Sequence, residues 1–242
     1  MTERRPIRSY VLRQGRMSPA QQRGLDEGWP RWGIDFDANM LLDAHALAQH
    51  FGRHAPLVME IGFGMGEGTV TMAQQRPDWN YLALDVHGPG VGSLLKKLEE
   101  AAITNVRVMR HDAVEVVERM LGSEILDGVH VFFPDPWPKL RHHKRRLIQT
   151  PFVHALVRCL KPDGYLHLAT DWEDYAQQMH AVLSAETGLA FIDPKGYVSR
   201  PDWRPLTRFE SRGMNLGHGV WDLVARRRDA EPVAEGQKGI PS

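Results

Sequence analysis

The sequence predicts an α/β fold in which a mainly parallel, doubly wound sheet carries helices on both faces. The first observation is that strand-like and helix-like segments alternate from residue 56 to residue 187, the order expected when helices connect parallel strands. The second is that the strand-like segments are short, continuous apolar runs, as in strands buried on both faces. With 242 residues, 42% of them hydrophobic and 25% charged, the chain can form one large domain with its own core or two small domains.

The predicted elements follow in a regular order. The first strand, residues 56–64, stops at glycines, and the helix after it, 67–77, ends at a proline. A second strand at 80–87 leads into a helix at 89–103 that has proline at its start, where a missing N–H does no harm. The same order repeats three more times, as strand 106–113 with helix 114–121, strand 126–136 with helix 150–164, and strand 165–171 with helix 172–187.

The two ends of the chain lack this alternation. Residues 1–37 mix Arg, Gly, Pro and aromatic residues without clear periodicity, which predicts an irregular basic arm. Residues 229–242 hold few large apolar side chains, which predicts a disordered tail. A single domain is therefore expected over residues 38–228.

Charge and cysteine content exclude several kinds of protein. Lys plus Arg and Asp plus Glu both number 30, so any nucleic-acid binding must come from a local cluster of cations. The single Cys159 rules out an internal disulfide and a multi-cysteine zinc site, and its apolar helical setting predicts a buried core thiol. No apolar run approaches the ~20 residues of a membrane span, and no signal-peptide pattern is recognised. A reducing cytoplasm is the expected compartment.

The first strand runs into the glycine-rich turn EIGFGMGEG, with glycine at 62, 64, 66 and 68. In a doubly wound sheet this turn lies at the carboxyl end of the strand, where ligands bind, and glycine lets the backbone approach a ligand closely. The alternative is a tight turn without a ligand, but four alternating glycines exceed what a turn needs. The dinucleotide pattern G-x-G-x-x-G fails, because its third glycine would fall on Glu67 or Thr69.

Three acids accompany this turn. Glu60 stands directly before the glycines, where it would repel a phosphate group but could accept hydrogen bonds from amines and hydroxyls; S-adenosylmethionine carries both and has no phosphate. Asp85 ends the second strand about 20 residues beyond the glycines, the usual place for an acid that binds ribose hydroxyls. Asp112 ends the third strand, where the adenine end of the ligand is expected. Each acid alone is more often a helix cap, but the set predicts a cofactor site.

Residues 132–146, FFPDPWPKLRHHKRR, place one acid between two prolines and then a dense block of cations. The prolines beside Asp135 restrict its backbone, which suits a carboxylate that must be held in place. Trp137 is expected either to stack on a base or to pack beneath the loop. The cations are either a solvated helix face or phosphate contacts, and their place directly after Asp135 favours phosphate contacts. His142 and His143 lack an acid or Cys partner at ligand spacing, so no metal is expected.

These motifs, together with ATDWEDY and the late TRFESRG…LGHGVWDL, resemble the bacterial tRNA (guanine-N7-)-methyltransferases over nearly the whole chain. The resemblance implies a Rossmann-like class I methyltransferase fold with S-adenosylmethionine as cofactor. It further implies methyl transfer to N7 of the variable-loop guanine, position 46, in tRNA. The expected partner is therefore tRNA, and no membrane association is expected.

Carried over position by position, the family pattern assigns roles to individual residues. Asp135 is the implied active-site residue, and Asp85 departs from the Glu that is more usual in the family at its position. The implied cofactor acids and the turn glycines expected beside them are Glu60, Asp85, Asp112 and Asp135 with Gly62, Gly64 and Gly66. The implied substrate-binding residues are Lys139, Arg141, Lys144, Arg145, Arg146, Asp171, Thr207, Arg208, Phe209 and Glu210.

Chemistry at guanine N7 explains why a fixed carboxylate is useful. N7 already carries a lone pair, so the reaction needs alignment of N7, the methyl carbon and the sulfur rather than removal of a proton. The purine gains positive charge as the bond forms, and a carboxylate at its N–H edge would accept hydrogen bonds that strengthen with that charge. Our hypothesis is that Asp135 orients the base and stabilises this charge without acting as an essential proton acceptor. Three roles are open for the arm: it adds RNA contacts, it folds over the cofactor, or it is disordered without a function.

Other functions fit parts of the sequence less well. An amino-group methyltransferase acting on adenine or cytosine would carry an acid or Asn followed by two prolines and an aromatic residue, whereas the order here is Asp-Pro-Trp-Pro. A non-catalytic RNA-binding module with a degenerate cofactor site is disfavoured by the intact turn and the strand-end acids. A nicotinamide oxidoreductase is disfavoured by the failed dinucleotide pattern.

Overall fold

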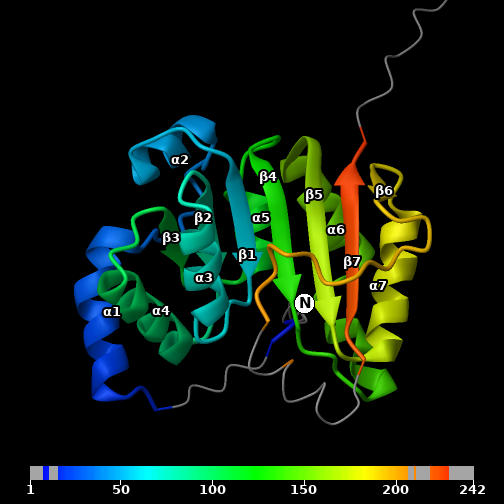
Figure 1. The fold of residues 1–242 in the computed structure, drawn as a ribbon, viewed down its shortest axis with the longest axis horizontal. Coiled ribbons are helices and arrows are strands. Elements are labelled where there is room, and N and C mark those ends of the chain that lie inside the picture. The colour runs from blue at the N-terminus through cyan, green and yellow to red at the C-terminus, as the bar shows by residue number, and fades with distance from the viewer. Residues whose placement is uncertain (1–7, 11–15, 207–209, 211–218, 229–242) are drawn as a thin grey trace, which may run out of the picture.

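A seven-stranded sheet in the order β3-β2-β1-β4-β5-β7-β6 forms the centre of the computed structural model (Figure 1), which describes residues 8–10, 16–206, 210 and 219–228. Neighbours among β1 to β5 pair in parallel, whereas β7 pairs antiparallel with both β5 and β6. The predicted mainly parallel α/β sheet is therefore confirmed. The strands are β1 Leu57–Ile61, β2 Asn80–Leu84, β3 Val106–Met109, β4 Leu126–Phe132, β5 Leu160–Thr170, β6 Leu189–Phe191 and β7 Trp221–Arg227.

Helices cover both faces of the sheet. The helices are α1 Pro19–Trp32, α2 Ala44–Phe51, α3 Glu67–Gln75, α4 Gly88–Glu100, α5 Ala113–Arg119, α6 Thr150–Cys159 and α7 Glu173–Ala185, with a short 3-10 helix, η1, at Leu140–Arg145. One apolar cluster joins α1, α3 and α4 to the β1–β3 half of the sheet. A second cluster joins α2, α5, α6 and α7 to the opposite face. This two-layer burial is what the continuous apolar strands require.

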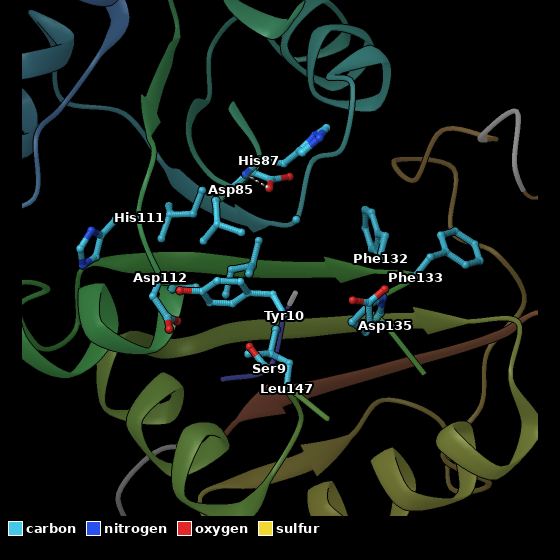
Figure 2. Close-up of a pocket in the computed structure, with 16 residues that line it drawn as sticks. Ser9, Tyr10, Asp85, His87, His111, Asp112, Phe132, Phe133, Asp135 and Leu147 are labelled. Atoms are coloured by element: carbon cyan, nitrogen blue, oxygen red, sulfur yellow. Dashed lines mark hydrogen bonds between the residues drawn. The ribbon is translucent and has the colours of Figure 1, made fainter. Parts of the chain in front are cut away.

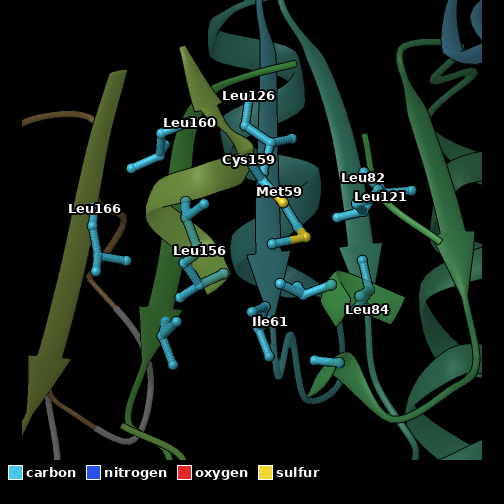
Figure 3. Packing of buried hydrophobic residues seen from close by; sticks show 14 of the residues in the cluster. Met59, Ile61, Leu82, Leu84, Leu121, Leu126, Leu156, Cys159, Leu160 and Leu166 are labelled. Atoms are coloured by element: carbon cyan, nitrogen blue, oxygen red, sulfur yellow. The ribbon is translucent and has the colours of Figure 1, made fainter. Parts of the chain in front are cut away.

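The larger of the two clusters contains the lone thiol. Figure 3 shows Cys159 and Leu156 of α6 directed at Met59 of the central strand β1. Cys159 is buried and reduced, and burial raises the pKa of its thiol. The prediction of a buried core thiol is confirmed, and an uncharged thiol in this setting acts as a small apolar side chain.

Strand β1 is the point at which the connections change direction, because β2 lies on one side of it and β4 on the other. In doubly wound sheets the helices on the two sides of such a point diverge and leave a crevice at the carboxyl ends of the strands. The ends of β1, β2, β3 and β4 meet at this edge, which is the lower edge of the sheet in Figure 1. Topology alone therefore places the candidate site there.

The prediction of an irregular arm over residues 1–37 is wrong for α1. Ser18 and Gln21 form a reciprocal capping box at its start, a strong helix-starting signal. The buried Trp32 closes the helix and donates its Nε1–H to the Ile103 carbonyl (2.9 Å). Gly24 and Gly28 obscure the apolar periodicity of this helix, yet they let it pack directly on α4, where a Cβ on Gly24 would lie 2.5 Å from the Gly92 oxygen.

The described residues include no helix that is long and apolar enough to cross a membrane. The predicted disordered tail at 229–242 lies outside the described residues.

Candidate functional site

A cavity of about 370 Å³ opens at the carboxyl edge of the sheet (Figure 2). Four of the sequence-predicted residues line it, namely Gly62, Asp85, Asp112 and Asp135. They come from the ends of β1, β2, β3 and β4 respectively, so residues far apart in the sequence meet in one place. The remaining lining is Ser9, Tyr10, Ile61, Leu84, Val86, His87, His111, Ala113, Phe132, Phe133, Pro134 and Leu147. The volume and the mixed apolar and acidic lining suit a small organic ligand.

The turn after β1 needs glycine for its backbone conformation. Gly62, Gly64 and Gly66 have φ values of +80°, +60° and +83°, in the region that side chains with a Cβ rarely adopt. A Cβ on Gly62 or Gly64 would meet no atom within 4 Å, so open space lies above the turn. The Gly64 N–H donates to Asp85 Oδ2 (3.1 Å), and this bond ties the turn to the end of β2.

Glu60 lies beneath the turn rather than in the cavity lining. Its side chain is only 5% exposed, and Thr69 donates its hydroxyl to Glu60 Oε2 (2.6 Å). Burial raises the pKa of Glu60 to about 7, although the Thr69 hydrogen bond opposes the shift. A buried acid poised between its two charge states accepts a hydrogen bond from a ligand amine more strongly once it ionises.

Asp85 and Asp112 already have backbone partners in the free protein. Asp85 also accepts from the His87 N–H (2.9 Å), and Asp112 caps α5 by accepting from the Val114 N–H (3.0 Å). Burial raises the pKa of both carboxyl groups. The cap and the ligand-binding role are compatible, because each carboxylate has more acceptor sites than these bonds use.

The loop that carries Asp135 has an unusual backbone. Phe133 and Trp137 on either side of it have φ values of +53° and +46°, a conformation that costs free energy in residues other than glycine. The Phe133 N–H donates to the Ala169 carbonyl (2.8 Å), so the loop leaves the sheet only after that residue. Asp135 itself is exposed at the cavity rim, where its carboxylate can reach an incoming base.

Arg146 holds this loop from behind, whereas the sequence predicts that it contacts RNA. The side chain is 2% exposed. Its Nε–H donates to the Pro136 carbonyl (2.8 Å), and its Nη2 forms an ion pair with Asp174 (2.5 Å). A guanidinium buried under the Asp135 loop cannot meet a phosphate on the surface. The place of Arg146 within a basic run of the sequence does not predict its burial. That burial depends on how η1 packs against α7, where Arg146 donates to Asp174 and Gln178.

The other cations of the run are accessible to different degrees. Lys139, Arg141 and Lys144 are exposed on or beside η1. Arg145 is half-buried and stacks over the Trp137 ring, with its guanidinium carbon 4.0 Å from the ring centroid. The basic surface of this region is therefore carried by three exposed residues, with Arg145 behind them.

Residues 8–10 cover one side of the cavity. Trp137 donates its Nε1–H to the Ser9 carbonyl (2.9 Å), and Arg145 donates to the carbonyls of Arg8 (3.2 Å) and Tyr10 (3.3 Å). Figure 2 shows the Tyr10 side chain directed toward Asp112, and burial and the Asp112 charge raise the pKa of the Tyr10 hydroxyl. Residues 9 and 10 of the arm thus lie over the cavity, and Trp137 packs beside the loop.

Two further predicted residues that the structure describes, Asp171 and Glu210, lie away from the cavity lining. Asp171 is half-buried at the end of β5 and does not cap α7, whose capping position is Trp172. Glu210 is buried, and both of its oxygens accept from Arg204. Thr207, Arg208 and Phe209 lie outside the described residues. No motif or periodicity in the sequence marks Arg204 as a buried residue. Its burial depends on Asp222 of strand β7, to which its side chain donates.

The part of the chain that the structure describes contains no candidate metal site. No three or more His, Cys, Asp or Glu side chains there are grouped so that they could hold a metal ion. His143 lies 3.7 Å from Asp174, which is an ion-pair distance rather than a ligand set.

Comparison with known proteins gives one family and one fold. The model of a family described as "Putative methyltransferase" matches residues 54–223. A tRNA (guanine-N(7)-)-methyltransferase of Chromobacterium violaceum is 56% identical over 225 residues, which are 93% of this chain and 97% of that protein. The enzyme of the same name from Nitrosospira multiformis is 57% identical over 93% of this chain and 96% of its own length.

Solved structures resemble the fold at low sequence identity. The 16S rRNA methyltransferase KamB superposes with a TM-score of 0.55 at 16% identity, covering 77% of this chain and 94% of that one. A 16S rRNA (adenine(1408)-N(1))-methyltransferase variant from Catenulisporales acidiphilia, solved with its cosubstrate SAM, gives a TM-score of 0.54 at 18% identity, covering 79% of this chain and 95% of that one. These likenesses support the Rossmann-like methyltransferase fold and nothing finer.

Proposed function

This chain belongs to the tRNA (guanine-N(7)-)-methyltransferase family, and on that premise we propose that it methylates N7 of the variable-loop guanine, position 46, in tRNA. The family gives the reaction, which is transfer of a methyl group from S-adenosylmethionine to guanine N7 in tRNA. The position within the tRNA is the finer part of the proposal. The observation that supports the proposed reaction is that one cavity is lined by Gly62, Asp85, Asp112 and Asp135.

The cavity fits S-adenosylmethionine, which supplies an activated methyl group on a positively charged sulfur. The fit is tested by the turn after β1, where open space lies above Gly62 and Gly64 and a Cβ would intrude on a bound ligand. Asp85 would hold the ribose hydroxyls, and Asp112 the adenine end. Glu60, beneath the turn, would stabilise it in the bound state. When ionised, these carboxylates accept hydrogen bonds and donate none. This matches a ligand that is rich in N–H and O–H donors.

The protein's contribution to the chemistry is alignment and charge stabilisation. Guanine N7 attacks with its own lone pair, so no general base is needed for bond formation. Asp135 at the cavity rim accepts hydrogen bonds from the N–H edge of the guanine and stabilises the positive charge that develops on the ring. The restricted backbone between Pro134 and Pro136 keeps this carboxylate in place without rearrangement during the reaction.

Binding of the tRNA itself falls to the exposed cations beside the cavity. Lys139, Arg141 and Lys144 are exposed on or beside η1, which follows the Asp135 loop in the chain, and they give a neutral protein a local positive field. The target guanine has to leave the folded tRNA core to reach the rim, and local extrusion of the nucleotide achieves this. A tRNA substrate also implies that the enzyme acts in the cytoplasm.

Methyl transfer to defined transcripts tests the proposal. Unmodified tRNA carrying guanine at the variable-loop position is incubated with S-adenosylmethionine labelled in its methyl group, beside a transcript with adenine at that position. We expect label in the guanine transcript only, with strand scission at that nucleotide after borohydride and aniline treatment. Label in both transcripts would contradict the proposed position, and absence of label despite cofactor binding would contradict tRNA as the substrate.

A further inference from the structure

We infer that Arg204 is a positioning residue of this site: it holds the aromatic turn that leads to Asp135, and Glu210 acts through Arg204 rather than by contacting the tRNA. The inference rests on the proposed function and goes beyond it, because Arg204 lies outside the cavity lining and touches none of the reacting groups. It starts from a buried cluster of charged side chains between β5, β7 and the segment before residue 207.

Arg204 forms ion pairs with two carboxylates at once. Its Nη1 and Nη2 donate to the two oxygens of Glu210 (2.6 and 2.7 Å), and its Nε and Nη2 donate to the two oxygens of Asp222 (2.7 and 2.9 Å). All three side chains are buried, with Arg204 fully so. Two bidentate pairs on one guanidinium fix both its position and the plane of its fork.

The sheet anchors this cluster. Asp222 lies on β7 opposite Ala169 of β5, and His167 of β5 contacts Asp222 Oδ1 through its Nε2 (2.7 Å). The Trp203 Nε1–H donates to the other ring nitrogen of His167 (3.2 Å). Since an indole N–H can only donate, His167 carries its proton on Nε2 and donates it to Asp222. The position of the guanidinium is thereby set by the strands and not by a loop.

The guanidinium in turn borders the turn at the end of β4. Its central carbon lies 5.8 Å from the ring centroid of Phe132 and 5.6 Å from that of Phe133, within the range of cation–π attraction. Both rings line the cavity, and Phe133 has the left-handed backbone conformation that begins the Asp135 loop. A strained turn persists only where its surroundings hold it, and Arg204 is part of those surroundings.

The Glu210 carboxylate forms part of this buried cluster. Its side chain is 3% exposed, and both carboxylate oxygens accept from Arg204. A tRNA group would have to enter this buried cluster to reach the carboxylate, because only 3% of Glu210 is exposed. The resemblance assigns substrate binding to Glu210, and the geometry points instead to an effect transmitted through Arg204 and the turn.

Lysine cannot replace arginine here, because an ammonium group lacks the planar fork that serves two carboxylates. The test therefore uses Arg204→Lys, Glu210→Gln and the double variant, with Arg227→Lys as the matched control. Arg227 lies on strand β7, as Asp222 does, and pairs with Glu124 (2.6 Å), so its replacement removes a guanidinium ion pair at the far end of that strand from the Phe133 turn. Single-turnover methylation of the guanine transcript, the KM for tRNA and binding of S-adenosylhomocysteine are measured for each.

We expect each single variant to lose roughly 10-fold to 100-fold in single-turnover rate through misplacement of the base, with KM for tRNA and S-adenosylhomocysteine affinity changed less than about threefold. Because the two residues act as a unit, the double variant should be no slower than the slower single variant. The Arg227→Lys control should keep the wild-type rate. A Glu210→Gln variant that raises KM for tRNA at an unchanged rate, or losses that multiply in the double variant, would overturn the inference.

Hydrogen exchange gives a readout that does not depend on activity. The Phe133 amide, bonded to the Ala169 carbonyl (2.8 Å), should exchange about tenfold faster in Arg204→Lys than in wild type or in Arg227→Lys, because the turn opens more often. Unchanged exchange would overturn the inference even if the substrate is not tRNA. Wild-type protein that leaves the guanine transcript unlabelled would instead contradict the proposed function, while faster exchange in Arg204→Lys would still support the positioning role.

Discussion

Glu60 is a buried acid beneath the glycine-rich turn. Its carboxyl group is almost fully buried and accepts a hydrogen bond from the Thr69 hydroxyl. Burial disfavours the ionised form, and this raises the pKa to about 7. Near neutral pH the folded protein is therefore destabilised by ionisation of this buried acid.

The first prediction concerns the pH dependence of stability. Since the pKa of Glu60 is higher in the folded protein (about 7) than its ordinary value of 4.5, its contribution is fully present below pH 4.5 and is lost as pH rises through 7. The loss amounts to roughly 3 kcal/mol by linkage. Glu60→Gln should remove this fall, so that the variant is more stable than wild type at pH 8 while binding S-adenosylhomocysteine less tightly. Chemical denaturation from pH 5 to 8 checks this, and parallel stability curves for the two proteins would contradict it.

Tyr10 is the second residue with a testable role, because its ring forms part of the cavity wall near Asp112. Removal of a half-buried aromatic wall takes apolar surface away from a ligand, whereas removal of the hydroxyl alone does not. Tyr10→Ala should therefore weaken S-adenosylhomocysteine binding roughly 5-fold to 30-fold, a loss of about 1–2 kcal/mol. Tyr10→Phe is the matched control and should stay within about twofold of wild type. Calorimetry measures both, and equal weakening in the two variants would assign the effect to the hydroxyl.

At the scale of elements, the parallel strands were largely predictable and the two antiparallel strands, β6 and β7, were not. Strands β1 to β4 stand in the chain where the sequence predicts them, because burial on both faces leaves a strong local signal. The predicted boundary between the helix at 150–164 and the strand at 165–171 is wrong, because α6 ends at Cys159 and β5 begins at Leu160, which pairs with Leu126 of β4. Strand β6 has only three residues, Leu189–Phe191, which is too short for any period to be visible. Strand β7 enters the sheet between β5 and β6 from much later in the chain, and such an insertion is decided by tertiary packing.

The same distinction holds for the site. Gly62, Asp85, Asp112 and Asp135 were predictable because each stands at a strand end, and parallel strands bring their ends together. Arg146 and Arg204 were not, because a buried arginine looks like a surface cation until its partners on other elements are known. Residues 8–10 pack beside Trp137 and Arg145 across more than a hundred residues of sequence, an arrangement that carries no local signal.

At the scale of the whole molecule, charge is balanced overall and concentrated locally. Lys plus Arg equals Asp plus Glu at 30 each, so attraction to tRNA depends on where the cations stand. Lys139, Arg141 and Lys144 are exposed around η1, whereas Arg146 in the same run is buried. Only the exposed ones can release counterions from the tRNA backbone when it binds.

Neutralising the exposed cations gives the corresponding prediction. Lys139→Gln with Lys144→Gln should weaken tRNA binding and lower the slope of log affinity against log salt by about 1.4–1.8, or about 0.7–0.9 for each phosphate that is no longer neutralised. Binding of S-adenosylhomocysteine should not change, because neither residue lines the cavity. Lys96→Gln with Lys161→Gln, which removes two charges from other elements, is the control and should leave the slope near wild type. An unchanged slope in the η1 variant would place the tRNA elsewhere on the molecule.

Asp135→Asn provides the most direct measurement of the central claim, that this cavity aligns guanine N7 for methyl transfer while Asp135 stabilises charge without removing a proton. Single-turnover rates with the guanine transcript are compared for wild type and variant in H2O and in D2O. The account predicts a loss of roughly 100-fold in the variant and, for each protein, the same rate in the two solvents, because no proton moves while the methyl group is transferred. A wild-type rate that is clearly slower in D2O would contradict it, because removal of a proton would then limit the step.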